Sequence, residues 1–288
     1  MSTLERIRTG DVSLAVRRWG DRTHPPILLV HGYPDNSRVW DGVAEHLADR
    51  YHVVAYDVRG AGRSSVPRRT RDYRLEYLAA DLAAVADAAT ADHRPVHLVG
   101  HDWGSIQAWD AVTEPRLADR FASFTSISGP CLDHVGQGLR EGRGKAGGLS
   151  QLRRSWYIGA FHLPFLAPLA WRTLLARRWP EMMQRLEGVR PPADDTRASD
   201  GVHGIKLYRA NVARRLLHPR ERRTDLPVQL VVPTRDPFVG PDLTRGVARW
   251  APDLRRVEIE AGHWLPLAHP ADTAGLIDGF IGDLAARR

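Results

Sequence analysis

The stretch Val96-His97-Leu98-Val99-Gly100-His101-Asp102-Trp103-Gly104 decides the fold of this chain. Its first four residues are mostly apolar, which indicates a buried strand, and a turn follows with glycine on both sides of Asp102. Such a turn takes a strand into a helix so tightly that a side chain at either glycine would clash with a neighbouring element. We therefore predict that Asp102 is exposed at the carboxyl end of a sheet, where open α/β sheets place their ligands.

Strands and helices alternate on both sides of this turn. Apolar runs bounded by turn residues predict strands over residues 12–19, 27–30, 52–56, 121–127, 228–232 and 257–260. Apolar residues at helical spacing predict helices around 40–47 (with Ser37 as its cap), 75–85 and 271–286. This alternation is typical of a mostly parallel central sheet with helices on both faces.

The alternation stops in the middle of the chain. Between residues 130 and 220 no strand is evident, and helix-like aromatic segments cover 156–161, 171–179 and 205–217. We therefore predict one α/β core formed by residues 1–129 and 221–288, interrupted by an inserted helical cap over residues 130–220.

Composition excludes several classes of protein. The chain has 288 residues, with 41 Lys and Arg against 34 Asp and Glu, a net charge of +7. The positive residues are almost all arginines, spread from Arg6 to Arg288 rather than gathered on one predicted face, so we expect no nucleic-acid partner. A single cysteine, Cys131, excludes a disulfide framework and a zinc site built from cysteines.

No segment indicates a membrane or an export signal. The apolar runs are far shorter than the roughly 18 residues that a bilayer-spanning helix needs. The first residues lack the apolar core of a signal peptide. We therefore expect a cytoplasmic protein without a transmembrane segment.

Two further polar residues follow predicted strands. Asp236 comes just after the strand at 228–232, and His263 comes just after the strand that ends at Glu260. The order Asp102, Asp236, His263 matches the order of nucleophile, acid and histidine in α/β-hydrolases, with aspartate as the nucleophile.

These motifs give the chain a family resemblance. With His31-Gly32-Tyr33-Pro34, Gly100-His101-Asp102-Trp103-Gly104, Asp236 and His263, it resembles the α/β-hydrolases of the epoxide hydrolase and haloalkane dehalogenase branch. The resemblance implies an α/β-hydrolase fold in which Asp102 forms a covalent ester and His263, oriented by Asp236, activates the water that hydrolyses it. It also implies an oxyanion hole from the Tyr33 and Trp103 backbone N–H groups, with no metal and no organic cofactor.

Features within the branch favour epoxides. Haloalkane dehalogenases typically have asparagine at the position of Tyr33, whereas epoxide hydrolases usually have an aromatic residue there. Epoxide hydrolases also carry two cap tyrosines, and Tyr157 (YIGAFHLP) and Tyr208 (LYRAN) match their contexts, although His162 stands where glutamine is frequent. The resemblance implies that both phenols donate protons to the opening epoxide.

The pocket is expected to be lined by His31, Pro34, Trp156, Phe161 and Trp264, and to take a small epoxide and water. Two alternatives stay open: a haloalkane dehalogenase, in which the Trp103 indole would hold halide, and a non-catalytic binding protein with the same fold. A serine esterase is disfavoured, because Ser105 lies after Gly104 rather than between the glycines.

The chain also resembles the N-terminal half of actinobacterial proteins in which such a hydrolase precedes a short-chain dehydrogenase. The sequence contains no dinucleotide-binding pattern, so the chain is either free-standing or a domain of a longer protein. The oligomeric state stays open as well, with a homodimer as one option.

Overall fold

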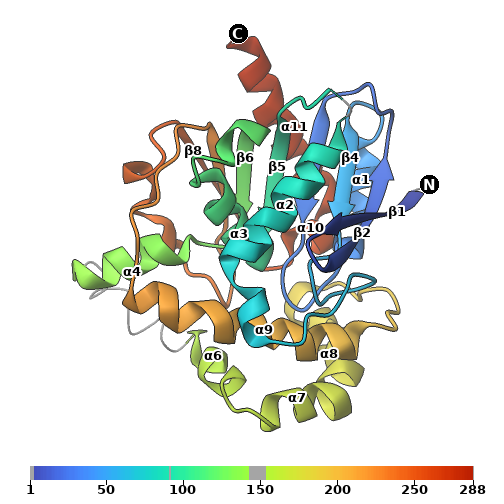
Figure 1. Cartoon of the computed structure of the whole chain (residues 1–288), viewed down its shortest axis with the longest axis vertical. Coiled ribbons are helices and arrows are strands. Elements are labelled where there is room, and N and C mark those ends of the chain that lie inside the picture. The colour runs from blue at the N-terminus through green and yellow to red at the C-terminus, as the bar shows by residue number, and fades with distance from the viewer. Residues whose placement is uncertain (1–2, 91, 143–153, 288) are drawn as a thin grey trace.

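One eight-stranded sheet organises the computed structural model, which describes residues 3–90, 92–142 and 154–287. The strands lie in the order β1-β2-β4-β3-β5-β6-β7-β8 (Figure 1). They span β1 Thr3–Thr9, β2 Val12–Trp19, β3 Pro26–Val30, β4 His52–Tyr56, β5 Val96–His101, β6 Phe121–Ile127, β7 Val228–Pro233 and β8 Leu254–Ile259. Only the β1–β2 and β2–β4 pairs are antiparallel, so the predicted mostly parallel α/β sheet is confirmed.

Helices cover both faces of the sheet. On one face α1 (Asp41–Leu47) packs against α11 (Pro270–Ala286), and on the other α2 (Leu75–Ala89) packs against α3 (Trp103–Val112) (Figure 1). Every residue of the central strands β3 and β4 is buried, as expected of strands covered from both sides.

The N-terminal region differs from the prediction in two places. The strand predicted to open the sheet is preceded by β1, whose residues are exposed or half-buried; its sequence TLERIRT has too few apolar residues to indicate a strand. Ser37 does not cap α1. Ser37 is the first residue of a short 3₁₀ helix, Ser37–Trp40, that precedes α1. The cap of this 3₁₀ helix is Asn36, whose side chain accepts a hydrogen bond from the Arg38 N–H.

Among the described residues between β6 and β7, the regular elements are all helices. They are α4 (Leu132–Arg140), α6 (Trp156–Phe161), α7 (Leu166–Ala170), a π-helical turn at Trp171–Leu175, α8 (Ala176–Glu187) and α9 (Arg197–Leu217). We call α4 to α9 the cap; they lie together at one end of the sheet (Figure 1). The helix predicted to begin at residue 205 begins earlier, at Arg197, and the boundaries at 130 and 220 stay a prediction.

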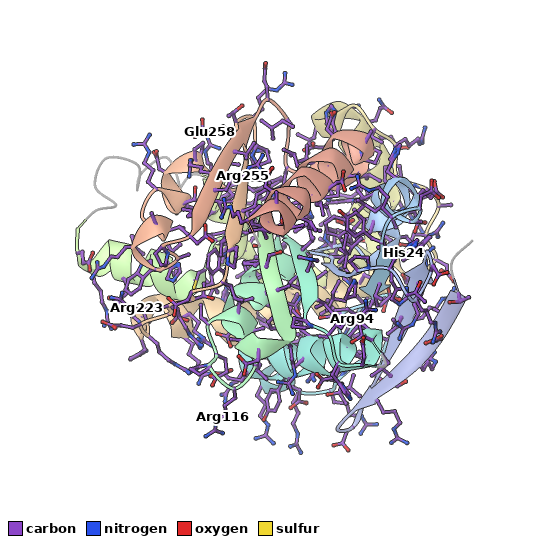
Figure 2. All side chains as sticks on the ribbon, turned by 90° about the horizontal axis from the view of Figure 1, so that it is seen from above. His24, Arg94, Arg116, Arg223, Arg255 and Glu258 are labelled. Carbon is purple, nitrogen blue, oxygen red and sulfur yellow. The ribbon has the colours of Figure 1, made fainter. Side chains whose placement is uncertain are left out.

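Many charged side chains lie on the surface outside the cap. Seen from the side opposite the cap, labelled arginines such as Arg116 and Arg223 point outward from the core (Figure 2). No helix among the described residues is long and apolar enough to cross a lipid bilayer.

A buried ionic cluster joins the cap to the core. Arg215 of α9 contacts Asp133 of α4 at 2.7 Å and Asp110 of α3 at 3.0 Å. Arg222, which follows α9, contacts the same two carboxylates at 3.3 and 2.7 Å. All four side chains are buried. Glu76 at the surface adds a further contact to Arg215 at 3.2 Å. Because the two arginines and two aspartates compensate most of one another's charge, removal of one arginine leaves carboxylates under-compensated in the interior.

We expect Arg215→Met to lower the free energy of unfolding by about 3–5 kcal/mol, because it leaves Asp133 and Asp110 under-compensated in a buried site. Urea denaturation measures the loss. The matched control is Arg214→Met: the Arg214 side chain is 41% exposed and pairs with Glu76 at the surface, so the loss should stay at about 1 kcal/mol or below. Equal losses in the two variants would show that the buried cluster does not join cap and core.

Candidate active site

Asp102 occupies the turn between β5 and α3, in a strained backbone conformation with φ +51°. The two flanking glycines have no room for a side chain. A Cβ at Gly104 would lie 2.0 Å from the Val30 carbonyl oxygen, and a Cβ at Gly100 would lie 2.6 Å from the Ser105 backbone. The structure therefore contains the tight turn that the sequence predicts, for the predicted steric reason.

The Asp102 carboxylate is held by the loop after β3. The Tyr33 backbone N–H donates to Asp102 Oδ1 at 2.7 Å. A Cβ at Gly32 would lie 2.4 Å from the same oxygen, so only glycine allows this approach. Trp103 is the first residue of α3, where a backbone N–H has no acceptor within the helix, and it stays the predicted second donor of the oxyanion hole.

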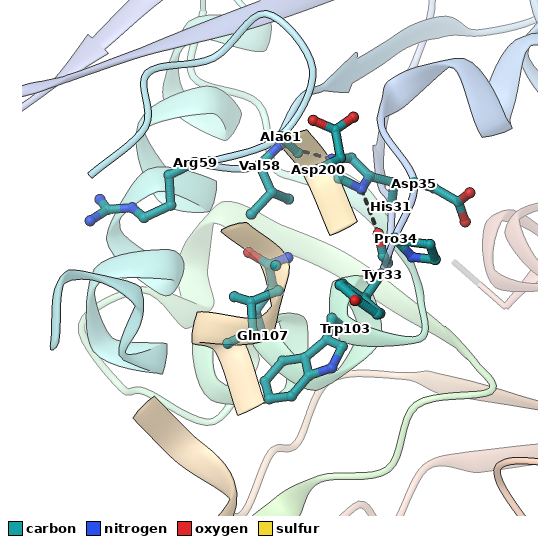
Figure 3. Close-up of a pocket in the computed structure, with 14 residues that line it drawn as sticks. His31, Tyr33, Pro34, Asp35, Val58, Arg59, Ala61, Trp103, Gln107 and Asp200 are labelled. Carbon is teal, nitrogen blue, oxygen red and sulfur yellow. Dashed lines mark hydrogen bonds between the residues drawn. The ribbon is translucent and has the colours of Figure 1, made fainter. Parts of the chain in front are cut away.

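His31 holds this loop in place. Its Nε2 accepts from the Val58 N–H at 2.9 Å, so Nδ1 carries the proton and donates to the Gly32 carbonyl at 2.8 Å. Burial lowers the pKa of His31, which keeps the ring neutral. His31, Tyr33, Pro34 and Trp103 line a cavity together with residues of α9 (Figure 3).

The loops after β7 and β8 bring Asp236 and His263 to Asp102. His263 Nδ1 donates to Asp236 Oδ2 at 2.8 Å, and His263 Nε2 lies 3.6 Å from Asp102 Oδ2. The other Asp236 oxygen accepts from the backbone N–H groups of Phe238 and Val239 at 2.7 and 2.9 Å. The imidazole thus lies between two carboxylates, one fixed by the backbone and one at the turn.

The two carboxylates favour a protonated imidazole. Burial alone lowers the pKa of His263, but the charge of Asp236, which also accepts the Nδ1 hydrogen bond, and the charge of Asp102 raise it to about 10. Burial likewise raises the pKa of Asp236, yet the adjacent His263 outweighs this and the net effect is a lowered pKa. With Asp102 ionised, His263 is therefore a cation at neutral pH.

The cap brings both predicted tyrosines to this site. Tyr157 of α6 and Tyr208 of α9 are 5.9 Å apart between ring centroids, and Tyr208 packs against Trp103 at 4.8 Å. Burial raises the pKa of each phenol, and the negative charge of Asp102 raises it further, so both stay protonated. The resemblance placed these two residues in one site, and the structure brings them together across the cap.

Among the residues predicted to line the pocket, one is placed elsewhere. Phe161 packs on Tyr208 at 4.9 Å, and the Trp264 ring lies 4.7 Å from His263. Trp156 is 72% exposed, so most of its ring faces solvent. It occupies the exposed side of α6, whereas its neighbour Tyr157 faces the site.

Three residues next to Asp102, Asp236 and His263 were not predicted from the sequence. Glu187, the last residue of α8, accepts a hydrogen bond from the His263 backbone N–H at 3.0 Å. Asp35 accepts from the Trp264 indole at 2.8 Å, and burial raises its pKa to about 7. Phe238 lies 5.1 Å from His263. Only Asp35 and Phe238 adjoin a motif, so they could have been found; no sequence pattern marks Glu187.

The described residues contain no group of three or more His, Cys, Asp or Glu side chains arranged to hold a metal ion. Ser105, the residue of the disfavoured esterase hypothesis, is buried and its hydroxyl donates to the Gly129 carbonyl at 2.7 Å.

Comparisons with known proteins place this site in a family. The family model of the alpha/beta hydrolase fold matches residues 25–270. A Mycobacterium tuberculosis protein named probable oxidoreductase EphD is 39% identical over 95% of this chain and 48% of its own length. Epoxide hydrolase A of the same organism is 34% identical over 67% of this chain and 56% of its own length. The chain thus spans about half the length of these relatives.

Solved structures share the fold. The epoxide hydrolase of Bacillus megaterium in complex with an inhibitor superposes with a TM-score of 0.79 at 21% identity, covering 96% of this chain and all of that one. At this identity, the likeness concerns the arrangement of sheet and cap.

We expect Asp102→Ala to lower the pKa of His263, because it removes a negative charge 3.6 Å from Nε2 that favours the imidazolium. Titration of the His263 ring by NMR measures the shift. Asp236→Ala should lower the pKa further, since the Asp236 charge is the largest of the effects that raise it. A His263 pKa that is unchanged without Asp102 would contradict the coupling of these two groups.

Proposed function

Because the chain belongs to the alpha/beta hydrolase fold family, we propose that it hydrolyses epoxides to vicinal diols through a covalent ester on Asp102. The observation that carries the proposal is the pair of buried phenols, Tyr157 and Tyr208, that the cap brings to an aspartate at the strand-to-helix turn. The similar proteins named epoxide hydrolase support the same substrate class.

In the first step Asp102 attacks an epoxide carbon. Oδ1 accepts from the Tyr33 N–H and becomes the carbonyl oxygen of the ester, which leaves Oδ2 as the nucleophile. The ring C–O bond breaks as the new C–O bond forms, and a proton from Tyr157 or Tyr208 moves to the developing alkoxide. A phenol whose pKa is raised by burial is not ionised beforehand, so its proton is available when the alkoxide appears.

In the second step water hydrolyses the ester. His263 takes one proton from the water while the hydroxide adds to the ester carbonyl carbon, and negative charge develops on Oδ1 beside the Tyr33 N–H. The tetrahedral intermediate collapses and the diol oxygen leaves with the proton from His263. The regenerated Asp102 carboxyl gives its remaining proton to the tyrosinate, which restores the tyrosine. The net reaction is the conversion of one epoxide and one water into one diol.

Ester formation itself makes His263 a base. In the free protein the charges of Asp236 and Asp102 hold its pKa near 10, and an imidazolium cannot accept a proton from water. Alkylation removes the negative charge of Asp102 that lies beside His263. The pKa of His263 then falls, and the imidazolium releases its proton to solvent just when water must be activated. It takes a proton up again from solvent when the Asp102 carboxylate is restored.

The dehalogenase alternative would require the Trp103 indole to bind halide. In this structure the Trp103 indole packs edge-to-face against the Tyr208 phenol, with 4.8 Å between the ring centroids. A proton donor of the cap thus lies beside the indole, which favours the opening of an epoxide over the release of a halide.

We expect His263→Gln to stop the reaction after its first step. Attack by Asp102 needs no base, so the ester should form and accumulate because nothing activates the water. Intact-protein mass spectrometry after addition of an epoxide such as styrene oxide should show one adduct with the mass of the epoxide. The double variant Asp102→Ala, His263→Gln is the control and should show none; an adduct that persists there would place the nucleophile elsewhere.

The cap tyrosines distinguish epoxide from halide chemistry. General acid catalysis contributes roughly 100- to 10,000-fold in rate, and an alkoxide needs the proton far more than a halide does. We expect the double variant Tyr157→Phe, Tyr208→Phe to lose nearly all ring opening in single-turnover measurements. Each single variant should lose about 100-fold or less, because one donor remains.

A matched control is Tyr51→Phe, whose phenol bonds to Asp278 on the core, away from the site. Its ring-opening rate should equal that of the wild type. A double cap variant within a few-fold of wild type would refute the role of the phenols as proton donors, and release of bromide from bromoalkanes by that variant would favour the dehalogenase.

A further inference from the structure

The tip of the cap carries an exposed apolar cluster. Phe165, Leu166 and Leu169 are 82%, 63% and 55% exposed, and their spacing over one helical turn places them side by side. Leu163, just before them, is also exposed. We call these four residues the cap-tip patch. They belong to α7 and the segment that leads into it, at the end of the molecule farthest from the C-terminus (Figure 1).

Basic side chains continue along the same helix. The chain runs from α7 through the π-helical turn into α8 without a break, and this stretch carries Arg172, Arg177 and Arg178, all exposed. None of these three forms an ion pair within the described part of the chain, whereas arginines of the core such as the exposed Arg50 and the half-buried Arg255 pair with aspartates. The cap helix thus offers three uncompensated positive charges beside the apolar cluster.

The net charge of the whole chain resides in this region. Residues 130–220 contain 16 Lys and Arg but only 7 Asp and Glu, while the rest of the chain has 25 against 27. The cap segment is therefore +9 and the core −2. The arginines are spread along the chain, but in the cap segment they outnumber the carboxylates, whereas in the core the two charges nearly balance.

An occupant of this surface must accept both apolar side chains and positive charge. A second copy of the chain would place one strongly positive cap against another, which is repulsive. A nucleic-acid backbone would satisfy the arginines but offers no apolar layer for Phe165 and the leucines. An anionic phospholipid bilayer satisfies both, because basic residues contact its headgroups while apolar residues enter the boundary with the acyl chains.

We propose that the cap-tip patch, with Arg172, Arg177 and Arg178, docks this protein on the surface of anionic phospholipid membranes. The apolar residues of α7 enter the headgroup region, and the arginines of the following turns lie along the lipid phosphates. Docking of this kind is peripheral and reversible, as expected of a helix with a few inserted side chains and adjacent positive charge. It does not depend on the proposed reaction.

Sedimentation with lipid vesicles tests the proposal. The full chain should bind vesicles that contain phosphatidylglycerol, should bind vesicles of phosphatidylcholine alone much more weakly, and should dissociate as salt is added. The variant Arg172→Gln, Arg177→Gln, Arg178→Gln should bind on the order of 100-fold more weakly, since each basic residue near an anionic surface contributes about fivefold. Phe165→Ser, Leu166→Ser, Leu169→Ser should also lose binding.

The matched control removes the same charge from the core. Arg116→Gln, Arg223→Gln, Arg255→Gln alters arginines outside the cap segment that point outward (Figure 2) and should bind like the wild type. Circular dichroism checks that all variants are folded. Equal loss in the core variant, or failure of the wild type to bind, would overturn the proposal. If the wild type sediments as a dimer and the serine variant sediments as a monomer in sedimentation velocity, the proposal is overturned too, and the patch is an interface between two copies.

Discussion

The lack of space around Asp102 is the constraint on which the site depends. A Cβ at Gly129 would lie 2.2 Å from the Asp102 carbonyl oxygen, and one at Gly32 would touch its carboxylate. The strand, the helix and two loops thus close on one residue from all sides. This packing holds Asp102 in a backbone conformation that costs about 1–3 kcal/mol, which persists only because its surroundings allow no other.

Electrostatic contacts fix the site in addition to the close packing. Asp102 and Asp236 share one imidazole between them, and a third carboxylate, that of Glu187, binds the backbone N–H of the same histidine from the cap. A Cβ at Gly262 would lie 2.2 Å from Glu187 Oε2, so this contact also needs glycine at its partner. The cap therefore does more than cover the site and supply phenols: the end of α8 helps to fix the loop that carries His263.

The parts of this arrangement that can be predicted from the sequence are those set by short residue patterns. The strand, the turn at Asp102 and the order of Asp102, Asp236 and His263 follow from residue patterns within a few positions of each element. β1 was missed because its polar sequence forms a strand only by pairing with β2, in a register that places Thr3 opposite Arg18. Glu187 and the exposure of Trp156 depend on how cap helices pack, and no short pattern encodes that.

The position of the cap in the chain has a consequence for how the protein is made. β1 to β6 are complete by Ile127, but β7, which pairs with β6, begins only at Val228. While the ribosome adds the cap, β6 is therefore the open edge of a sheet, with buried apolar residues such as Phe124 still uncovered. Edges of this kind recruit strands from other chains. The edge stays open while about 100 further residues are synthesised, which takes some five to twenty seconds. During that interval the nascent chain is most exposed to aggregation and most in need of a chaperone.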